Sequence, residues 1–148
     1  MANELRQKAI RLLARREHTQ AELAHKLAAH GTQEEVDAVL AEMQALHLQS
    51  DDRAAESYVR SHAARLGASS LRQNLKSRGV TSDLIDAQLA QDGLPSEQER
   101  AREVWRKKFS TAPADSREWA RQARFLQGRG FASDIIRRVL KEPIEEEQ

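Results

Sequence analysis

The stretch LRQNLKSRGV at residues 71–80 shows the pattern that decides the fold. Its two leucines, four residues apart, share one helical face, and the basic residue and glycine that follow are typical of a helix end. The same arrangement occurs as LAHKLAAHG at residues 23–31 and, with glutamine for the first leucine, as QARFLQGRG at residues 122–130. The closing glycines lie 48 and 51 residues apart. This period predicts three repeats, each with a short second helix that ends on glycine. One irregular helical domain is the alternative.

Residues typical of helix starts and helix ends mark the limits of the other predicted helices. Thr19-Gln-Ala-Glu22, Thr32-Gln-Glu-Glu35 and Ser96-Glu-Gln-Glu99 are predicted capping boxes, and Asp115 opens the aspartate version. Five glycines fall where the apolar periodicity stops, and we predict them to be left-handed C-terminal caps: Gly31, Gly67, Gly79, Gly93 and Gly130.

These marks predict an all-α fold of about nine short helices. We place them near residues 4–18, 20–30, 33–48, 51–66, 70–78, 82–92, 97–109, 116–129 and 133–142. They form three tandem three-helix repeats, residues 1–49, 50–94 and 95–142, followed by an acidic tail at 143–148. Each repeat has few large apolar side chains, so we expect the repeats to stack in an elongated, curved arrangement.

Composition excludes several kinds of site. The chain of 148 residues has no cysteine, which excludes disulfides, zinc–thiolate sites, iron–sulfur clusters and cysteine nucleophiles. It has no apolar run near 18 residues, and its first residues lack the apolar core of a signal peptide. We therefore expect a cytoplasmic protein with no membrane partner.

The net charge of +1 conceals a strong asymmetry. Residues 1–49 carry six basic and seven acidic side chains, and residues 50–94 carry six of each. Residues 100–141 carry twelve basic and four acidic side chains, whereas residues 142–148 carry four glutamates and no basic residue. The basic block predicts an anionic partner, with the tail as a local competitor, although a solvated helical surface has the same composition.

Residue types that support catalysis occur in unsuitable patterns. No pair of the five histidines has the His-Glu-x-x-His spacing that places two imidazoles on one helical face. Asp51 and Asp52 stand at a predicted helix start, where carboxylates cap amides and offset the positive helix end. Gly128-Arg129-Gly130 follows no predicted strand and lacks the Gly-Lys-Ser/Thr element of a phosphate loop. We therefore predict no catalytic residue, no metal site and no cofactor.

The third repeat has the composition of a binding surface. Arg117, Arg121 and Arg124 recur at i, i+4 and i+7 on its second helix, which makes one basic stripe. Five cations crowd its first helix: Arg100, Arg102, Arg106, Lys107 and Lys108. Five of the six aromatic residues lie among these cations, where they could stack on bases of single-stranded nucleic acid. Because this repeat has few other large apolar groups, we favour the core for Trp105, Phe109 and Phe125, and leave Trp119 open. The second helix of each repeat also has a helix-turn-helix outline, which in the middle repeat presents Arg72, Lys76 and Arg78.

Longer segments resemble one known family. They are LLARREHTQAELAHKL at residues 12–27, SDDRAAESYVRS at 50–61, GASSLRQNLKSRGV at 67–80, RKKF at 106–109 and RFLQGRGF at 124–131. In this order they are similar to the RecX regulators of the bacterial RecA recombinase. The middle repeat departs from the family pattern at Ala54, Ser70 and Asn74.

The resemblance implies a monomeric regulator that docks in the groove of the RecA–single-stranded DNA filament and limits its extension. Such a protein inhibits the recombinase and coprotease activities of RecA, and so modulates recombinational DNA repair and the SOS response. The predicted partner-binding residues, for the RecA filament or DNA, are Arg72, Lys76, Arg78, Arg102, Arg106, Lys107, Lys108, Arg117, Arg121, Arg124 and Arg129. Two alternatives stay open: a sequence-independent protein that binds single- or double-stranded DNA without RecA, and a helical scaffold for another protein.

Overall fold

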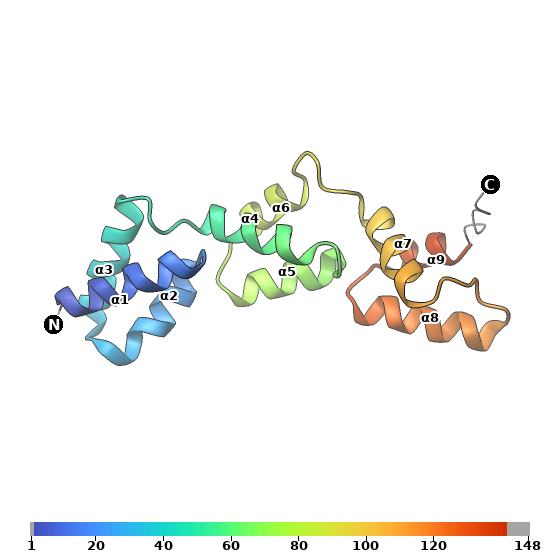
Figure 1. Cartoon of the computed structure of the whole chain (residues 1–148), viewed down its shortest axis with the longest axis horizontal. Helices are drawn as coiled ribbons and strands as arrows, with labels where there is room; N and C mark the ends of the chain where they lie inside the picture. Colours follow the sequence, from blue (N-terminus) through green and yellow to red (C-terminus); the bar gives the residue numbers. More distant parts are fainter. Residues whose placement is uncertain (1, 142–148) are drawn as a thin grey trace. The chain divides into compact units, whose positions relative to one another are not determined.

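The computed structural model describes residues 2–141, apart from the side chain of Ala2. Within this range the chain forms nine α-helices, one short 3₁₀ helix and no strand (Figure 1). The elements are α1 (Ala2–Arg15), α2 (Gln20–Leu27), η1 (Ala28–His30), α3 (Gln33–Ala45), α4 (Asp51–His62), α5 (Ala68–Ser77), α6 (Ser82–Leu89), α7 (Glu97–Lys108), α8 (Ser116–Gly128) and α9 (Ser133–Lys141).

The predicted all-α class and the predicted helices are confirmed. Every helix begins within two residues of its predicted start, but α1, α2, α3, α4 and α6 end three or four residues early; after α2 the 3₁₀ helix η1 continues to His30. At α3 the reason is local: His47 adopts a left-handed φ of 59°, which stops the helix before the apolar pattern does.

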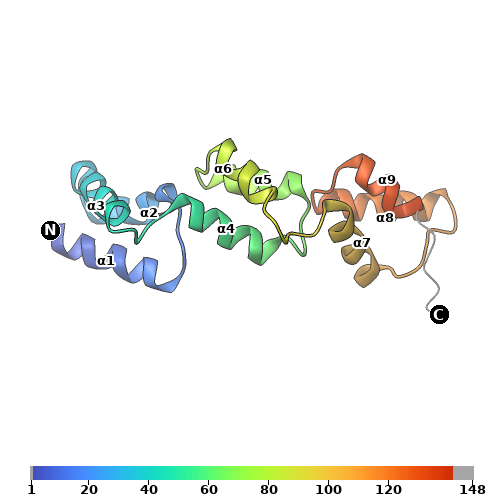
Figure 2. The same cartoon turned by 90° about the horizontal axis from the view of Figure 1, so that it is seen from above.

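The chain divides into two compact units, residues 1–58 with 75–88, and residues 59–74 with 89–148. In the first unit, α1, α2 and α3 pack pairwise, as Figure 2 also shows. Their apolar stripes meet in one core, whose buried members are Leu5, Ala9, Leu23, Leu27, Val36, Val39, Leu40 and Met43. The Leu23–Leu27 pair of the first repeat therefore faces this core, as its spacing predicts.

The start of α2 is tied to the turn after α5 within the same unit. The Thr19 hydroxyl donates a hydrogen bond of 2.6 Å to the Arg78 carbonyl oxygen. Gly79 follows with a φ of 83°, and a Cβ atom built there would lie 2.7 Å from the Cβ of Ala21. Glycine is therefore required at position 79 for two reasons: its backbone is left-handed, and α2 lies too close to leave room for a Cβ atom.

The second unit has its core among α7, α8 and α9, which also pack pairwise. Its buried members are Ala101, Leu126, Phe131, Ile136, Val139 and Leu140. Trp105, Trp119 and Phe125 are only partly buried against this core, and Phe109 is half-buried at the end of α7. The expectation of core positions thus holds in part: Trp105 and Phe125 pack against the core but stay partly exposed, whereas Phe109 packs edge to face on Phe125.

The turn before α9 packs against the start of α5 in the second unit. The amide of Gly67 donates to the Arg129 carbonyl at 2.8 Å, and the amide of Ser69 donates to the Gly130 carbonyl at 3.2 Å. A Cβ at Gly67 would overlap the Gly130 carbonyl, so glycine is needed there for close approach. Glu97 accepts hydrogen bonds from the amides of Ala68 and Ala132, at 3.4 and 3.3 Å. Its carboxylate therefore links the start of α5 to the residue before α9.

The capping predictions are confirmed at Thr19 and Thr32, where both bonds of the capping box form. At Ser96 and Asp115 the side chain caps its helix, but the returning bond from the glutamate side chain is absent among the described residues. Left-handed glycines are confirmed at Gly79, Gly93 and Gly130. The prediction was wrong at Gly31, which is extended with a φ of −170°, and at Gly67, whose role is the close approach.

Candidate interaction surface

The end of α7 and the length of α8 bring two aromatic rings and three cations together. Phe109 and Phe125 meet edge to face, with ring centroids 5.4 Å apart and planes at 88°. The Lys108 ammonium lies 5.4 Å from the Phe125 ring centroid and the Arg129 guanidinium 5.1 Å from it, while the Arg121 guanidinium lies 5.2 Å from the Phe109 centroid. We call these five residues the aromatic–cationic cluster.

Helix geometry accounts for the cluster. Arg121, Phe125 and Arg129 recur every four residues, so they lie along one side of α8 and its C-terminal cap. Lys108 is the last residue of α7, Phe109 is its C-terminal cap, and α7 packs against α8. Cation–π attraction holds the three charged groups near the rings and leaves them exposed.

The arrangement favours anion binding over base stacking. Cations already lie over the two rings, so a nucleic-acid base would have to displace them in order to stack. A phosphate or carboxylate group instead gains charge-assisted hydrogen bonds from side chains that are already positioned. The cluster therefore fits sequence-independent contact with an anionic backbone or an acidic protein surface.

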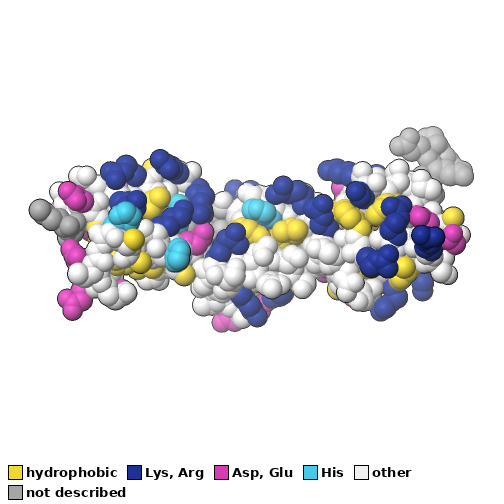
Figure 3. All heavy atoms as spheres, turned by 90° about the horizontal axis from the view of Figure 1, so that it is seen from below, with side chains coloured by type: hydrophobic (Ala, Val, Ile, Leu, Met, Phe, Trp, Pro, Cys, Tyr) yellow, Lys and Arg dark blue, Asp and Glu magenta, His cyan; other side chains and the backbone are white. Residues whose placement is uncertain are grey.

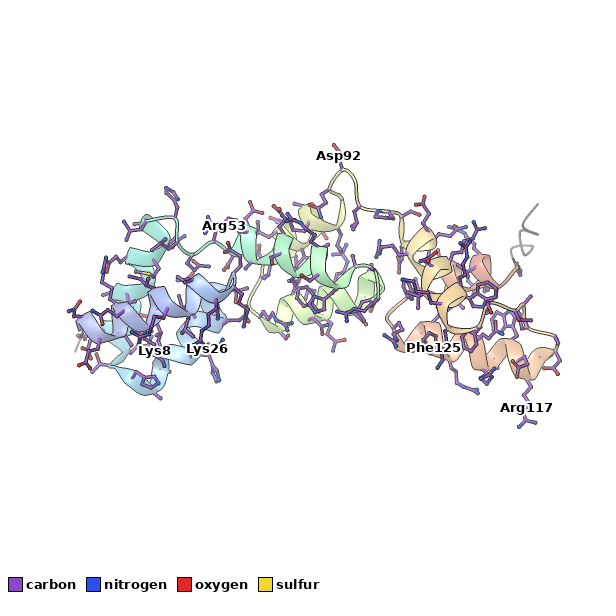
Figure 4. All side chains as sticks on the ribbon, in the orientation of Figure 1. Lys8, Lys26, Arg53, Asp92, Arg117 and Phe125 are labelled. Carbon is purple, nitrogen blue, oxygen red and sulfur yellow. The ribbon has the colours of Figure 1, made fainter. Side chains whose placement is uncertain are left out.

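The predicted stripe on α8 is present, since Arg117, Arg121 and Arg124 are all exposed. Figure 4 shows Arg117 extending away from the helix. Arg121 pairs with Glu118 at 3.1 Å and Arg106 with Glu103 at 3.8 Å, but exposed pairs of this kind are weak and yield to a competing anion.

The other predicted cations of α7 differ in exposure. Arg106 and Lys107 are exposed and Arg102 is half-buried. Figure 3 shows lysine and arginine side chains in dark blue on the α7–α9 part of the chain. Arg100, which the sequence groups with these cations, faces the interior instead and is only 7% exposed. It donates hydrogen bonds to the carbonyls of Ala63 and Pro95, and burial lowers its pKa.

The three predicted cations of α5 do not belong to the aromatic–cationic cluster. Lys76 is exposed and Arg72 is half-buried. The Arg78 guanidinium stacks 4.7 Å from the centroid of Tyr58 and lies 3.9 Å from Glu22. Arg78 therefore helps to join α2, α4 and the turn after α5, in addition to any contact with a partner.

Glu22 belongs to the same network. Its carboxylate accepts from the Thr19 amide at 3.0 Å and from Arg16 at 3.1 Å. Burial alone would raise its pKa, but the hydrogen bond from Thr19 and the positive charges of Arg16 and Arg78 together hold it below the ordinary value.

The first repeat has a basic region that its total charge did not predict. Residues 1–30 carry six basic and three acidic side chains, whereas residues 31–49 carry four acidic and none basic. Lys8, Arg11 and His30 line a cavity of about 330 Å³ beside Glu4. The nearly balanced charge of the whole repeat concealed that α1 and α2 are basic and α3 is acidic. A count of charges for each helix would have shown this difference.

The structural interpretation of the paired aspartates is confirmed. Asp51 accepts hydrogen bonds from the Gln20 amide at 2.8 Å and the Gln49 side chain at 3.0 Å. Asp52 accepts from the Gln88 side chain at 2.8 Å. These carboxylates join the start of α4 to α2 and α6.

His18 is a packing residue. It is 1% exposed, its Nδ1 lies 3.0 Å from the Arg16 carbonyl oxygen, and its Nε2 lies 2.9 Å from the Lys26 ammonium. Burial lowers its pKa, as do the positive charges of Arg16 and Lys26. Among the described residues no three histidine, aspartate or glutamate side chains gather in a way that could hold a metal ion.

None of the helices in residues 2–141 has the length and apolar character needed to cross a membrane.

Comparison with known proteins covers all three repeats. The family models of the first, second and third three-helix domains of RecX match residues 6–43, 50–95 and 96–140. The regulatory protein RecX of Leptothrix cholodnii is 48% identical over 139 residues, which cover 93% of this chain and 87% of that protein. The RecX of Chromobacterium violaceum is 46% identical over 138 residues, with 92% and 88% coverage.

Solved structures agree at the level of the fold. The crystal structure of RecX from Lactobacillus salivarius superimposes with a TM-score of 0.76 at 21% identity and covers 95% of this chain and 94% of that one. A second structure of a regulatory protein RecX gives a TM-score of 0.79 at 22% identity. Three consecutive domain matches and close relatives over nearly the whole length lead to one conclusion: this chain belongs to the RecX family of regulatory proteins.

Proposed function

We propose that this protein regulates RecA by binding the RecA–single-stranded DNA filament in its groove, where it limits extension of the filament and its recombinase and coprotease activities. It acts there as a binding protein rather than an enzyme, in the cytoplasm, and it modulates recombinational repair and the SOS response. The repeats that carry this role are residues 1–49, 50–94 and 95–142.

The observation that supports the proposal most directly is the exposed cationic surface of α7 and α8. The cations of the aromatic–cationic cluster and of the α8 stripe lie in the third three-helix domain, and their charge supports a role in binding anionic groups. A nucleoprotein filament offers phosphate and protein carboxylates together. Further cations on α1–α2 and α5 add separate weak contacts, which combine through effective concentration along a polymer.

The proposed contact residues are the eleven cations predicted from the sequence. Those of α7, α8 and the α8 cap bind phosphate or carboxylate groups. Arg78 contributes chiefly by holding the turn after α5 in place, because its guanidinium already stacks on Tyr58.

The experiment measures ATP hydrolysis by RecA on single-stranded DNA with substoichiometric amounts of this protein. We expect strong loss of hydrolysis well below one molecule per RecA protomer, because capping one filament end affects many protomers. Reversal of Lys107, Lys108, Arg121 and Arg124 to glutamate should remove the effect. The matched control exchanges lysine and arginine at the same four positions, which keeps the charge. Unchanged hydrolysis with wild-type protein at equimolar amounts would refute the proposal.

The second candidate is a protein that binds DNA independently of RecA, favoured by the same cations. Binding to naked single-stranded DNA as tight as binding to the filament, with no effect on hydrolysis, would support it instead.

A further inference from the structure

The side chain of Arg100, in the first turns of α7, is buried although it is charged. Arg100 is only 7% exposed, and its guanidinium donates to the Ala63 carbonyl at 2.9 Å and the Pro95 carbonyl at 3.0 Å. Its Nη2 atom is buried and has no hydrogen-bond partner. The carboxylate of Glu97 offsets part of its positive charge, but one donor of the buried guanidinium has no acceptor among the described residues, which is costly.

Arg100 belongs to the wall of a cavity of about 530 Å³ in the second unit. The wall combines the end of α4 and the residues after it, the loop before α7 and the first turns of α7. Figure 4 shows Asp92, one of the lining residues, on this loop. Ala63, Ala64, Leu94 and Pro95 supply apolar surface, and both carbonyls that bind Arg100 come from lining residues. The buried guanidinium is therefore part of the structure that lines the cavity.

The charge around this cavity is opposite to that of the aromatic–cationic cluster. Its acidic lining residues are Asp92, Glu99 and Glu103, all exposed, against the two arginines Arg60 and Arg100. Three exposed carboxylates disfavour the phosphates of nucleic acid and attract basic groups. The apolar wall suits the apolar side chains of a peptide, and the acidic rim suits its basic side chains.

We propose that this cavity is the docking site for a basic segment of the protein component of the filament, and this rests on the proposed function. A basic side chain of the segment lies against the acidic rim, and apolar side chains of the segment pack against the apolar wall. The chain thus presents two chemically different surfaces: cations on α7–α8 for anionic groups, and an acid-rimmed cavity for protein.

The test compares binding to RecA–single-stranded DNA filaments with binding to naked single-stranded DNA. The double variant Glu99→Lys/Glu103→Lys reverses the charge of two exposed residues of the acidic rim. Ala64→Trp fills the cavity and leaves the charge unchanged. We expect each to weaken filament binding at least tenfold. Naked-DNA binding should stay the same or, for the double variant, become tighter, since it gains positive charge.

The matched control is Glu34→Lys/Asp37→Lys, which makes the same change in net charge at exposed positions of α3. Filament binding that is unchanged in both cavity variants, or weakened equally by the control, would overturn the inference, as would equal loss of naked-DNA binding. Circular dichroism and thermal unfolding confirm that each variant is folded. Failure of wild-type protein to bind the filament would overturn the proposed function and this inference with it, whereas normal wild-type binding with unaffected variants overturns the inference alone.

Discussion

Alanine at Gly79 should destabilise the protein much more than alanine at Gly93, although the two glycines have nearly the same backbone conformation. Their φ angles are 83° and 88°. An alanine in this left-handed region costs about 1–2 kcal/mol, which both variants share. The two sites differ in what the new methyl group meets.

At Gly93 an added Cβ has no heavy atom within 4 Å, whereas at Gly79 it lies 2.7 Å from the Cβ of Ala21. Since ordinary contacts between such carbons begin near 3.5 Å, α2 or the turn must move. Overpacking of this kind costs about 1–3 kcal/mol. We therefore expect Gly93→Ala to lose about 1–2 kcal/mol and Gly79→Ala about 2–5 kcal/mol.

Urea unfolding followed by circular dichroism measures these free energies. The decisive variant is Ala21→Gly/Gly79→Ala, which removes the obstructing methyl group. Ala21→Gly alone should cost up to about 1 kcal/mol, because glycine lowers helix propensity. The double variant should then recover about 1–3 kcal/mol relative to the sum of the single ones.

Equal losses in Gly79→Ala and Gly93→Ala, or additive losses in the double variant, would refute the reasoning. Either result would mean that α2 does not press on the turn after α5. The left-handed conformation would then be the whole reason for glycine at this position.

Three further predictions concern charge. Glutamate at Lys107, Lys108, Arg121 and Arg124 should make binding to single-stranded DNA less salt-dependent, lowering the slope of log K against log salt by up to about 3; an unchanged slope in a folded variant would exclude this surface. Residues 143–148 lie outside the described residues, and their deletion should tighten binding to the same DNA. The effect should be largest at low salt, where the Debye length is about 30 Å. Equal affinities of full-length and truncated protein in 0.01 M salt would contradict this prediction. Because the pKa of His18 is lowered in the folded state, its protonation opposes folding, so stability should fall as the pH drops below about 6.5. Urea midpoints at pH 7.5 and 5.5 test this: His18→Gln should lose much of the pH dependence, whereas the same change at exposed His25 should retain it.

The number and starts of the helices could be predicted because their signals are local. A capping box needs only four consecutive residues, and Thr19 and Thr32 form theirs as expected. The stripe of Arg117, Arg121 and Arg124 follows from helical spacing alone, so its position on one exposed side of α8 was also predictable. Family membership could be recognised for the same reason, since each matching segment is short and continuous.

Other features depend on residues far apart in the chain. Gly67 was mistaken for a helix cap because nothing near it in the sequence shows that the turn at Gly130 packs against it. Arg100 was grouped with the surface cations because composition does not show which side of α7 is covered. The cations over Phe109 and Phe125 also required the contact between α7 and α8.

The sequence by itself therefore determined the all-α class, the helices and the basic character of the third repeat, because hydrogen bonds and side-chain spacing within one or two turns decide them. Only the tertiary structure decided which cations form a cluster and which one is buried beside an acid-rimmed cavity. Burial and contact between helices are properties of packing, and packing joins residues whose separation in sequence carries no local signal.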